Sequence, residues 1–335
     1  MRGLLPHVAA FAVATALALV VWSRGDKAED HGTTQKVEVW GGTKDRVERI
    51  RFEAPQRSVS IEARQDAAGR YYVGVVERED KPPPPRADAG TPPAETPPKK
   101  TTTRFVGVKE AGELADKLAP LLATRQIGPL AGGRAEEFGF DKPEGTLKVR
   151  IGGAEQTLVI GATTPGGQER YAKREPGGIV YAVSGDIVQT LIGAESRLLE
   201  RELHGFPEAD VTRIRISRGG KSREAVTFPD KKGAWADAAQ PGKLDETLGN
   251  FLGKVSRLHV TEYVETPAAP LTPESAVLHI EYFGGAKSLG FLELYKVPAE
   301  KGSEYLLRTE YGRWYVKVLT SAGEQVEQDV GSVVK

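Results

Sequence analysis

The chain has 335 residues, of which 39% are hydrophobic and 27% are charged, a composition typical of a globular protein that can bury a core. Lys plus Arg and Asp plus Glu each total 46, so no strong net charge draws the chain to nucleic acid or to an anionic membrane surface. The chain has no cysteine, which excludes disulfides, thiolate metal sites and thiol catalysis.

The first predicted element is an apolar helix over Leu4–Trp22. This segment has no formal charge if His7 is neutral, and it would span roughly 28 Å, close to the thickness of a bilayer core. A cleaved signal peptide is an alternative because Ala16–Ala18 offers small residues, but the apolar run continues past this point. A buried helix of a soluble protein is a second alternative, although the segment lacks a polar stripe. We therefore expect an N-terminal transmembrane anchor within residues 1–24.

Alternating strands follow the anchor. In the first of them, Glu48, Ile50 and Phe52 share a predicted face, and Arg49 and Arg51 lie on the other face. A second strand is expected to present Val59, Ile61 and Ala63, and an aromatic third strand covers 71–73.

A proline-rich segment then separates these strands from the next element. Residues 79–103 contain eight prolines, so we expect an extended and solvated segment with polyproline II character. A proline-recognising partner is one interpretation, and a plain solvated loop is the other.

A helical period replaces the strand period after the prolines. Leu114, Leu118, Leu121 and Leu122 form one apolar face. Pro120 interrupts this pattern, and a kink or an early stop is expected there because proline removes a helical hydrogen bond.

Four more strands and a connecting helix complete the first half. The strand positions are Leu147 to Ile151, Leu158 and Ile160, Tyr171, and Tyr181. A glycine pair at 152–153 suits a tight hairpin with positive φ. Residues 186–204 are predicted to form a further helix.

The second half of the chain repeats this pattern. VERIR at 47–51 returns as VTRIR at 211–215, and the helical leucines return as Leu244, Leu248, Phe251 and Leu252, continued by Val255 and Leu258. The strand residues return in the same way, at the following positions: Thr212, Ile214 and Ile216; Val226 and Phe228; Trp235; Leu278, Ile280 and Tyr282; Leu289 and Phe291; Tyr305; Tyr315; and a glycine pair at 284–285.

The duplication predicts the domain organisation. We expect two tandem α+β repeats, 36–204 and 205–335, each a mainly antiparallel sheet packed on an amphipathic helix. The second repeat has only the short stretch 236–243 where the first has its prolines. The segment 79–103 is therefore expected to be a loop insertion within the first repeat.

A search for chemistry finds no site pattern. The five histidines form no close metal-spaced pair, and no phosphate-binding glycine loop or nucleophile elbow is present. No catalytic residue, cofactor or metal is therefore expected. Three Tyr and Arg positions of the first half recur in the second, and we interpret the six residues as partner-binding because Tyr and Arg are favoured at interfaces. A purely stabilising role in the sheets is the alternative. The six residues are Tyr171, Arg174, Tyr181, Tyr305, Arg308 and Tyr315.

The order of several short motifs resembles a known family. EFGFDKP at 137–143, TLKV at 146–149, LVIG at 158–161, Tyr171 and VY at 180–181 are similar to motifs of the bacterial domain of unknown function 4340 family. The second half departs from this pattern, since Leu292 stands where Gly161 would be matched. The resemblance implies a membrane-anchored envelope protein, with association with ABC-type transport or gliding-like components, and it carries over no catalytic residue because the family has no established activity.

These observations lead to one functional expectation. We expect an accessory or scaffold protein that is anchored once in the inner membrane, with most of the chain on the extracytoplasmic side. Its partner would be a membrane-protein complex and not nucleic acid. An envelope protein that binds a ligand or polymer is the alternative, and an enzyme is the least favoured class.

Overall fold

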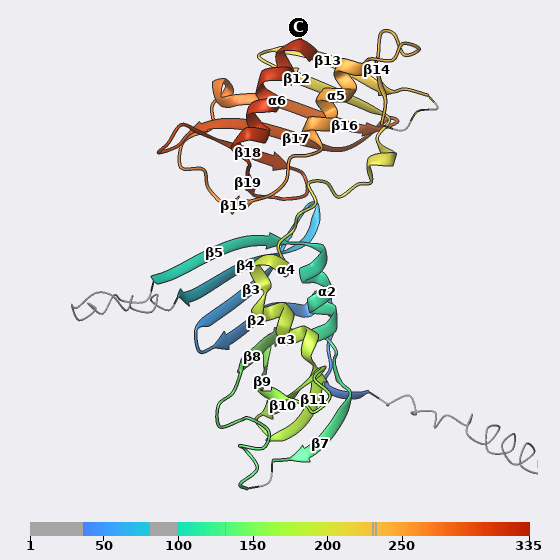
Figure 1. Cartoon of the computed structure of the whole chain (residues 1–335). Helices are drawn as coiled ribbons and strands as arrows, with labels where there is room; N and C mark the ends of the chain where they lie inside the picture. Colours follow the sequence, from blue (N-terminus) through green and yellow to red (C-terminus); the bar gives the residue numbers. More distant parts are fainter. Residues whose placement is uncertain (1–35, 81–98, 131, 230, 232) are drawn as a thin grey trace, which may run out of the picture.

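The computed structural model describes residues 36–335 except 81–98, 131, 230 and 232. Two large antiparallel sheets follow one another along the chain, and helices cover one face of each (Figure 1). The expected α+β class is confirmed. In the described part of the chain no helix is long and apolar enough to cross a membrane. The anchor predicted over Leu4–Trp22 lies outside the described residues.

The first unit contains a sheet of nine strands in the order β5-β4-β3-β2-β8-β9-β10-β11-β7. A small second sheet pairs β1 with β6 beside it. The elements are β1 (Val37–Trp40), η1 (Lys44–Arg46), β2 (Val47–Ala54), β3 (Arg57–Asp66), β4 (Gly69–Asp80), β5 (Lys99–Gly107), α2 (Lys109–Leu118), β6 (Leu121–Ala123), β7 (Arg125–Pro129), β8 (Gly145–Ile151), β9 (Ala154–Thr163), β10 (Glu169–Glu175), β11 (Ile179–Ser184), α3 (Gly185–Ile192) and α4 (Ala194–Arg197).

The second unit contains a sheet of eight strands in the order β14-β13-β12-β16-β17-β18-β19-β15. If β5 is left out, the strands of the two sheets have the same spatial order, with β4 corresponding to β14, β2 to β12, β8 to β16 and β7 to β15. The elements are η2 (Glu208–Asp210), β12 (Arg213–Arg218), β13 (Lys221–Thr227), β14 (Trp235–Asp237), α5 (Glu246–Val255), β15 (Glu262–Val264), η3 (Pro273–Ser275), β16 (Ala276–Gly284), β17 (Lys287–Pro298), β18 (Ser303–Thr309), β19 (Tyr315–Val318) and α6 (Thr320–Val333).

The start of each unit departs from simple alternation. Ile50 and Phe52 are buried as expected, but Glu48 is exposed and Val47 is buried in its place. The ladder between β2 and β8 shifts register between Val47 and Arg49, and such a bulge turns the extra residue to the other face. Thr212, expected on the buried face with Ile214, is likewise exposed and precedes β12.

Two matched positions in the second unit are also wrong. Ala225, and not Val226, pairs with Ile214 and is buried. In β17 the buried residues are Leu292, Leu294 and Val297, whereas the predicted Leu289 and Phe291 are only partly buried. A register shift between Tyr282 and Phe283 moves the partner strand, and a shift of one residue exchanges the two faces of a strand.

The two helices beside the sheets are shorter than the apolar pattern predicted. Each has 10 residues. The expected early stop before Pro120 is confirmed, since α2 ends at Leu118, whose carbonyl accepts a hydrogen bond from Trp40 Nε1 at 2.7 Å. Leu121 lies in β6 and not on the helix, and Leu122 is 41% exposed. In α5 the side chains of Leu248, Phe251 and Val255 are buried.

The proline-rich insertion is narrower than expected. The ladder between β4 and β5 continues to its ends and pairs Glu79 with Lys100. Residues 79–80 and 99–103 are therefore strand and not solvated loop, and only 81–98 lies outside the described residues. The added strand β5 is the reason that the first sheet has nine strands.

The remaining connections are partly as expected. Both Gly152 and Gly153 have positive φ in the β8–β9 turn, but in the β16–β17 turn only Gly285 does, because Gly284 still pairs with Lys287. The helix expected over 186–204 is two short helices, α3 and α4, and ends at Arg197. The helix α6 was not anticipated, although Val326, Val330 and Val333 form its buried face.

A buried carboxylate organises the junction between the two units. Glu200 is 4% exposed. Its side chain accepts hydrogen bonds from the backbone N–H of Lys109 at 3.2 Å and from those of Arg201 and Glu202 at 3.0 Å. Its own carbonyl accepts a hydrogen bond from Tyr263 Oη of the second unit at 3.0 Å. One residue thus joins the start of α2, the linker and β15.

Arg313 makes a second contact across the junction. Its side chain is 8% exposed and pairs with Asp66 of the first unit, with Nε and Oδ2 3.1 Å apart. Its guanidinium lies 5.1 Å from the ring centroid of Tyr71 and 5.7 Å from that of Tyr311. Arg313 has φ of 59°, a left-handed conformation that costs a non-glycine residue free energy unless other contacts hold it.

Breaking the Arg313 contact is expected to loosen the arrangement of the units. Burial raises the pKa of Asp66, but the hydrogen bond and charge of Arg313 outweigh it and lower the pKa below its ordinary value. The pair is therefore present above about pH 4 and is lost as the pH falls through the lowered pKa. Because the chain has no cysteine, spin labels at Ala154→Cys and Lys301→Cys report the distance. Arg313→Ala should broaden the distance distribution at pH 7, as acid does for the natural chain.

The control for this measurement is Arg134→Ala, which removes an ion pair within the first unit. This variant should leave the distance distribution unchanged. A distribution that is equally narrow in Arg313→Ala and in the natural chain would contradict the role of the junction.

The N-terminus of α5 generates a second prediction. Asp245 is the N-cap residue, and its side chain accepts a hydrogen bond from Leu248 N at 2.9 Å and pairs with Arg223 at 2.6 Å. Asp245→Ala is expected to lower the free energy of unfolding of the second unit by about 1 kcal/mol. Urea denaturation measures this loss. The exposed loop variant Glu300→Ala should cost much less, and equal losses would contradict a capping role.

Candidate functional site

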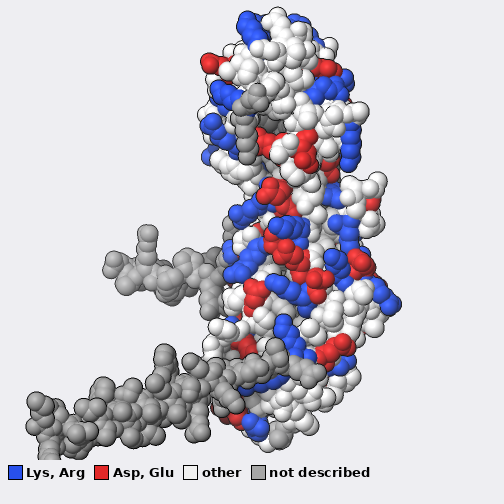
Figure 2. Space-filling model, turned by 90° about the vertical axis from the view of Figure 1, so that its right-hand side faces the viewer, with Lys and Arg blue, Asp and Glu red and all other residues white. Residues whose placement is uncertain are grey.

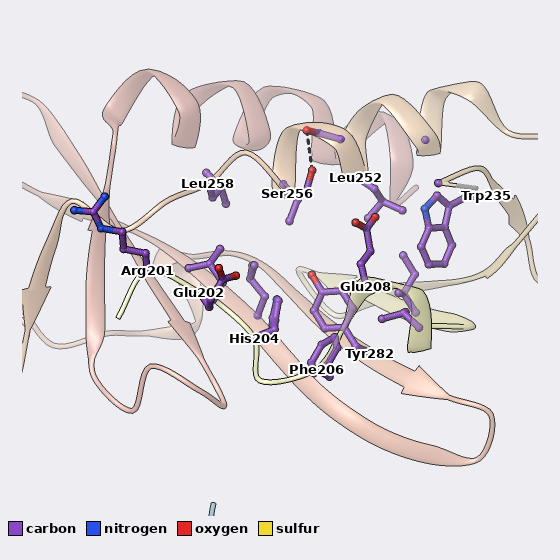
Figure 3. Close-up of a pocket in the computed structure, with 18 residues that line it drawn as sticks. Arg201, Glu202, His204, Phe206, Glu208, Trp235, Leu252, Ser256, Leu258 and Tyr282 are labelled. Atoms are coloured by element: carbon purple, nitrogen blue, oxygen red, sulfur yellow. Dashed lines mark hydrogen bonds between the residues drawn. The ribbon is translucent and has the colours of Figure 1, made fainter. Parts of the chain in front are cut away.

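A cavity lies beneath α5 in the second unit, and we call it the α5 pocket (Figure 3). Its volume is about 380 Å³. It is surrounded by the linker before η2, by strand β12, by the start of β14 and by one side of α5. The lining residues are Arg201, Glu202, Leu203, His204, Phe206, Glu208, Val211, Ile214, Gly233, Trp235, Gly249, Leu252, Gly253, Val255, Ser256, Leu258, Tyr282 and Leu292.

Aromatic rings form one wall of the α5 pocket. The rings of His204 and Phe206 stack at a centroid distance of 4.7 Å, and Tyr282 meets His204 edge-on at 4.7 Å. Figure 3 shows the Tyr282 hydroxyl directed into the cavity and the Glu208 side chain rising between Tyr282 and Trp235. Burial, together with the charges of Glu310 and Glu208, raises the pKa of Tyr282, so its phenol stays neutral at physiological pH.

A network behind this wall fixes the histidine. His204 Nδ1 lies 3.1 Å from Glu310 Oε2, which also accepts a hydrogen bond from Phe291 N at 3.0 Å. Gly205 N donates to the other oxygen at 3.3 Å. Gly290 makes room for the carboxylate, because a Cβ there would lie 2.3 Å from Glu310 Cδ. His204 Nδ1 is thus committed to Glu310, which fixes the orientation of the ring.

Trp40 of the first unit stands at the chain position that matches His204. Trp40 precedes Val47 by as many residues as His204 precedes Val211. The indole of Trp40 is buried and closes the end of α2, as described above. In the second unit Gly249 and Gly253 of α5 leave volume, since nothing lies within 4 Å of where their Cβ atoms would be.

The six predicted partner-binding residues do not form one surface. Arg174 donates a hydrogen bond to Val39 O at 2.8 Å. Tyr181 is buried, and Tyr305 is buried under α6 with its hydroxyl bonded to Glu327. Tyr171 packs edge-on against Phe138 at 4.8 Å in the first unit.

The predicted matching of these residues is wrong by one position. In the first sheet, the residues paired across successive strands lead from Phe52 to Arg174. In the second sheet they lead from Ile216, which matches Phe52 in the repeat, to Thr309, so Thr309 and not Arg308 is the equivalent of Arg174. Arg308 is therefore on the opposite face from the equivalent of Arg174, because side chains alternate along a strand.

The structure does bring Arg308 and Tyr315 together, on the face of the second sheet that points away from α5 and α6. The Arg308 guanidinium lies 5.7 Å from the ring centroids of both Phe291 and Tyr315. We call the group of half-buried and exposed residues on this face the open-face cluster. It consists of His279, Phe291, Glu293, Tyr295, Arg308 and Tyr315.

Ion pairs set the charge of the open-face cluster. His279 Nδ1 lies 3.4 Å from Glu293 Oε1, and the Glu293 hydrogen bond raises the pKa of His279 more than burial lowers it. The same bond lowers the pKa of Glu293. Burial and the nearby Glu293 raise the pKa of Tyr295 to about 12, so its hydroxyl stays protonated. The cluster can therefore donate hydrogen bonds and present aromatic faces to a partner.

Sequence reasoning missed the α5 pocket entirely. Only the glycines of α5 hinted at it, because Gly249 and Gly253 are spaced by one helical turn inside an apolar pattern. No group of three or more His, Asp or Glu residues that could hold a metal occurs in the described ranges. Basic and acidic side chains are interspersed over the face shown in Figure 2 and do not gather in large areas of one sign.

The motifs that resemble a family form a structural corner of the first unit. Gly139 has φ of 73°, and a Cβ on Gly161 would lie 2.1 Å from Phe138 O, so the turn can rest on β9 only if residue 161 is glycine. Phe138 in this turn packs against Tyr171 of β10. These residues specify packing, and none of them lines the α5 pocket.

Comparison with known proteins identifies the family. The model of the family described as Domain of unknown function (DUF4340) matches residues 112–275, which include most of α2, the corner turn and α5. No curated protein and no solved structure matches the chain. The chain belongs to the DUF4340 family.

Proposed function

We propose that this protein is an accessory or scaffold protein of the bacterial cell envelope, made of two tandem repeats behind a single membrane anchor. The two units share their strand order, which supports the duplication. The apolar segment Leu4–Trp22 supports the anchor, with the folded units on the extracytoplasmic side of the inner membrane. The binding function rests on the open-face cluster.

The position of Arg308 is the observation that carries this proposal. Its side chain is 44% exposed, yet it is held between two aromatic rings on a sheet face away from the helices. Arginine and tyrosine concentrate binding free energy in protein interfaces, because their flat apolar surfaces and donors can both be buried by a partner. The partner we propose is a membrane-protein complex, of ABC-type transport or gliding-like components as the family resemblance suggests.

Crosslinking in intact cells tests the binding surface. Arg308→Ala should reduce the yield of a specific crosslinked partner roughly tenfold, as expected for loss of an interface arginine. The matched control is Arg51→Ala, since Arg51 is a strand arginine of the first sheet with a similar exposure of 48%. Equal yields from the two variants, or recovery of abundant envelope proteins alone, would contradict the proposal.

Membrane extraction tests the anchor separately. The full chain should stay in the membrane fraction through salt and alkaline carbonate washes, because about 19 apolar residues bury enough surface to resist both. A chain that lacks residues 1–24 should be released. Release of the full chain by a mild salt wash would refute the anchor without bearing on the open-face cluster.

A second candidate function is the binding of a soluble ligand in the envelope. The α5 pocket favours it, because a cavity of about 380 Å³ lies within the range of small-molecule sites. This function is compatible with a scaffold role, since the pocket and the open-face cluster occupy different parts of the second unit.

A further inference from the structure

We propose that the α5 pocket binds a small organic cation, a molecule with an apolar body and an ammonium group. This inference does not depend on the proposed binding of a partner by the open-face cluster. It rests on the shape of the pocket, on its apolar lining, and on the arrangement of aromatic rings and carboxylates around it.

The pocket has space that the fold does not need. The cavity lies open beneath α5, although the residues that line it include several buried apolar side chains. Gly253 and Gly249 line the cavity on one side of the helix. Glycine in a helix interior costs about 1 kcal/mol relative to alanine. Two such residues in one helix of 10 residues keep the cavity open at the expense of stability.

The floor of the pocket suits an apolar body. Leu252, Val255 and Leu258 line it from α5 and the turn after it, and Ile214 and Leu292 line it from the sheet. A ligand that buries apolar surface against these side chains gains roughly 25 cal/mol for each Å² removed from water.

The rim of the pocket suits a cation. Phe206 and Trp235 line it with aromatic rings, which attract a cation that lies over their faces, and the Tyr282 hydroxyl, directed into the cavity, can accept a hydrogen bond from an ammonium group. Glu208 rises between Tyr282 and Trp235, and Glu202 stands at the other end (Figure 3). Over the described ranges, neither carboxylate takes part in an ion pair.

The basic residue of the lining does not reverse this preference. Figure 3 shows the Arg201 guanidinium directed away from the cavity, and its Nη2 donates to Ser196 O at 3.2 Å. His204 is engaged by Glu310, as described above. A carboxylate or phosphate ligand would therefore meet the exposed carboxylates of Glu202 and Glu208, which disfavours anions.

Calorimetric titration of the full chain with a matched series of probes tests the inference. The probes are 4-phenylbutylammonium, 4-phenylbutanol and 4-phenylbutanoate, which share their apolar body and differ in the charge of the head group. We expect the ammonium to bind roughly tenfold more tightly than the alcohol, and the carboxylate to bind more weakly than either. Carboxylate binding that equals or exceeds ammonium binding, or no binding of the ammonium, would overturn the proposal.

Variants place the binding in the pocket. Gly253→Leu should abolish ammonium binding, because its side chain would extend into the cavity, where a Cβ meets no atom within 4 Å. Gly112→Leu on α2 is the matched control, since its Cβ also meets nothing within 4 Å and it lies outside the pocket. Glu208→Gln should reduce the preference for ammonium over alcohol roughly fivefold while leaving alcohol binding unchanged.

Two outcomes of the variant series contradict the site. Retained ammonium binding in Gly253→Leu, with unfolding at the same temperature as the natural chain, would place the probe elsewhere. An unchanged preference in Glu208→Gln would remove the electrostatic basis of the proposal. Neither result would affect the crosslinking of Arg308, so the two functions are tested independently.

Discussion

The arrangement of the two units depends on one buried carboxylate. Glu200 lies at the junction, where its side chain satisfies three backbone N–H groups and its carbonyl binds Tyr263. A carboxyl group at 4% exposure is tolerated only when it is hydrogen-bonded, since an unsatisfied buried polar group costs free energy. The first turn of α2, the linker and β15 must therefore come together at one point, and the linker runs on from there to form the wall of the α5 pocket.

The two units share one strand order but differ in the residues at equivalent turns. At the turn between the last two long strands, the first unit has Gly178 with φ of 66°, and the second has Arg313 with φ of 59°. The glycine adopts this conformation freely, whereas the arginine needs its contacts with Asp66 and two tyrosine rings to hold it. The two units therefore share a strand order and differ in the residue that holds this turn.

Much of the fold was predictable because buried apolar residues recur at the regular spacing of a strand or of a helix. Alternation correctly identified the cores around Ile50 and Ile214, and the helical period located α5. The errors were errors of register. The bulge after Val47 and the shift near Tyr282 each move a strand by one residue, and at period two such a shift exchanges core and surface. Arg308 was matched to Arg174 because YAKR at 171–174 and YLLR at 305–308 look alike, although the two arginines lie on opposite faces of their sheets.

The amino-acid sequence by itself determined the α+β class, the antiparallel order of strands around a helix, the early stop of α2 and the membership of the DUF4340 family, because these follow from local periodicity, proline chemistry and short motifs. Only the tertiary structure decided which tyrosines and arginines meet, that Glu200 and Arg313 join the units, and that a cavity remains beneath α5. Those features depend on contacts between residues far apart in the chain, and on volume left unfilled, which no local pattern records.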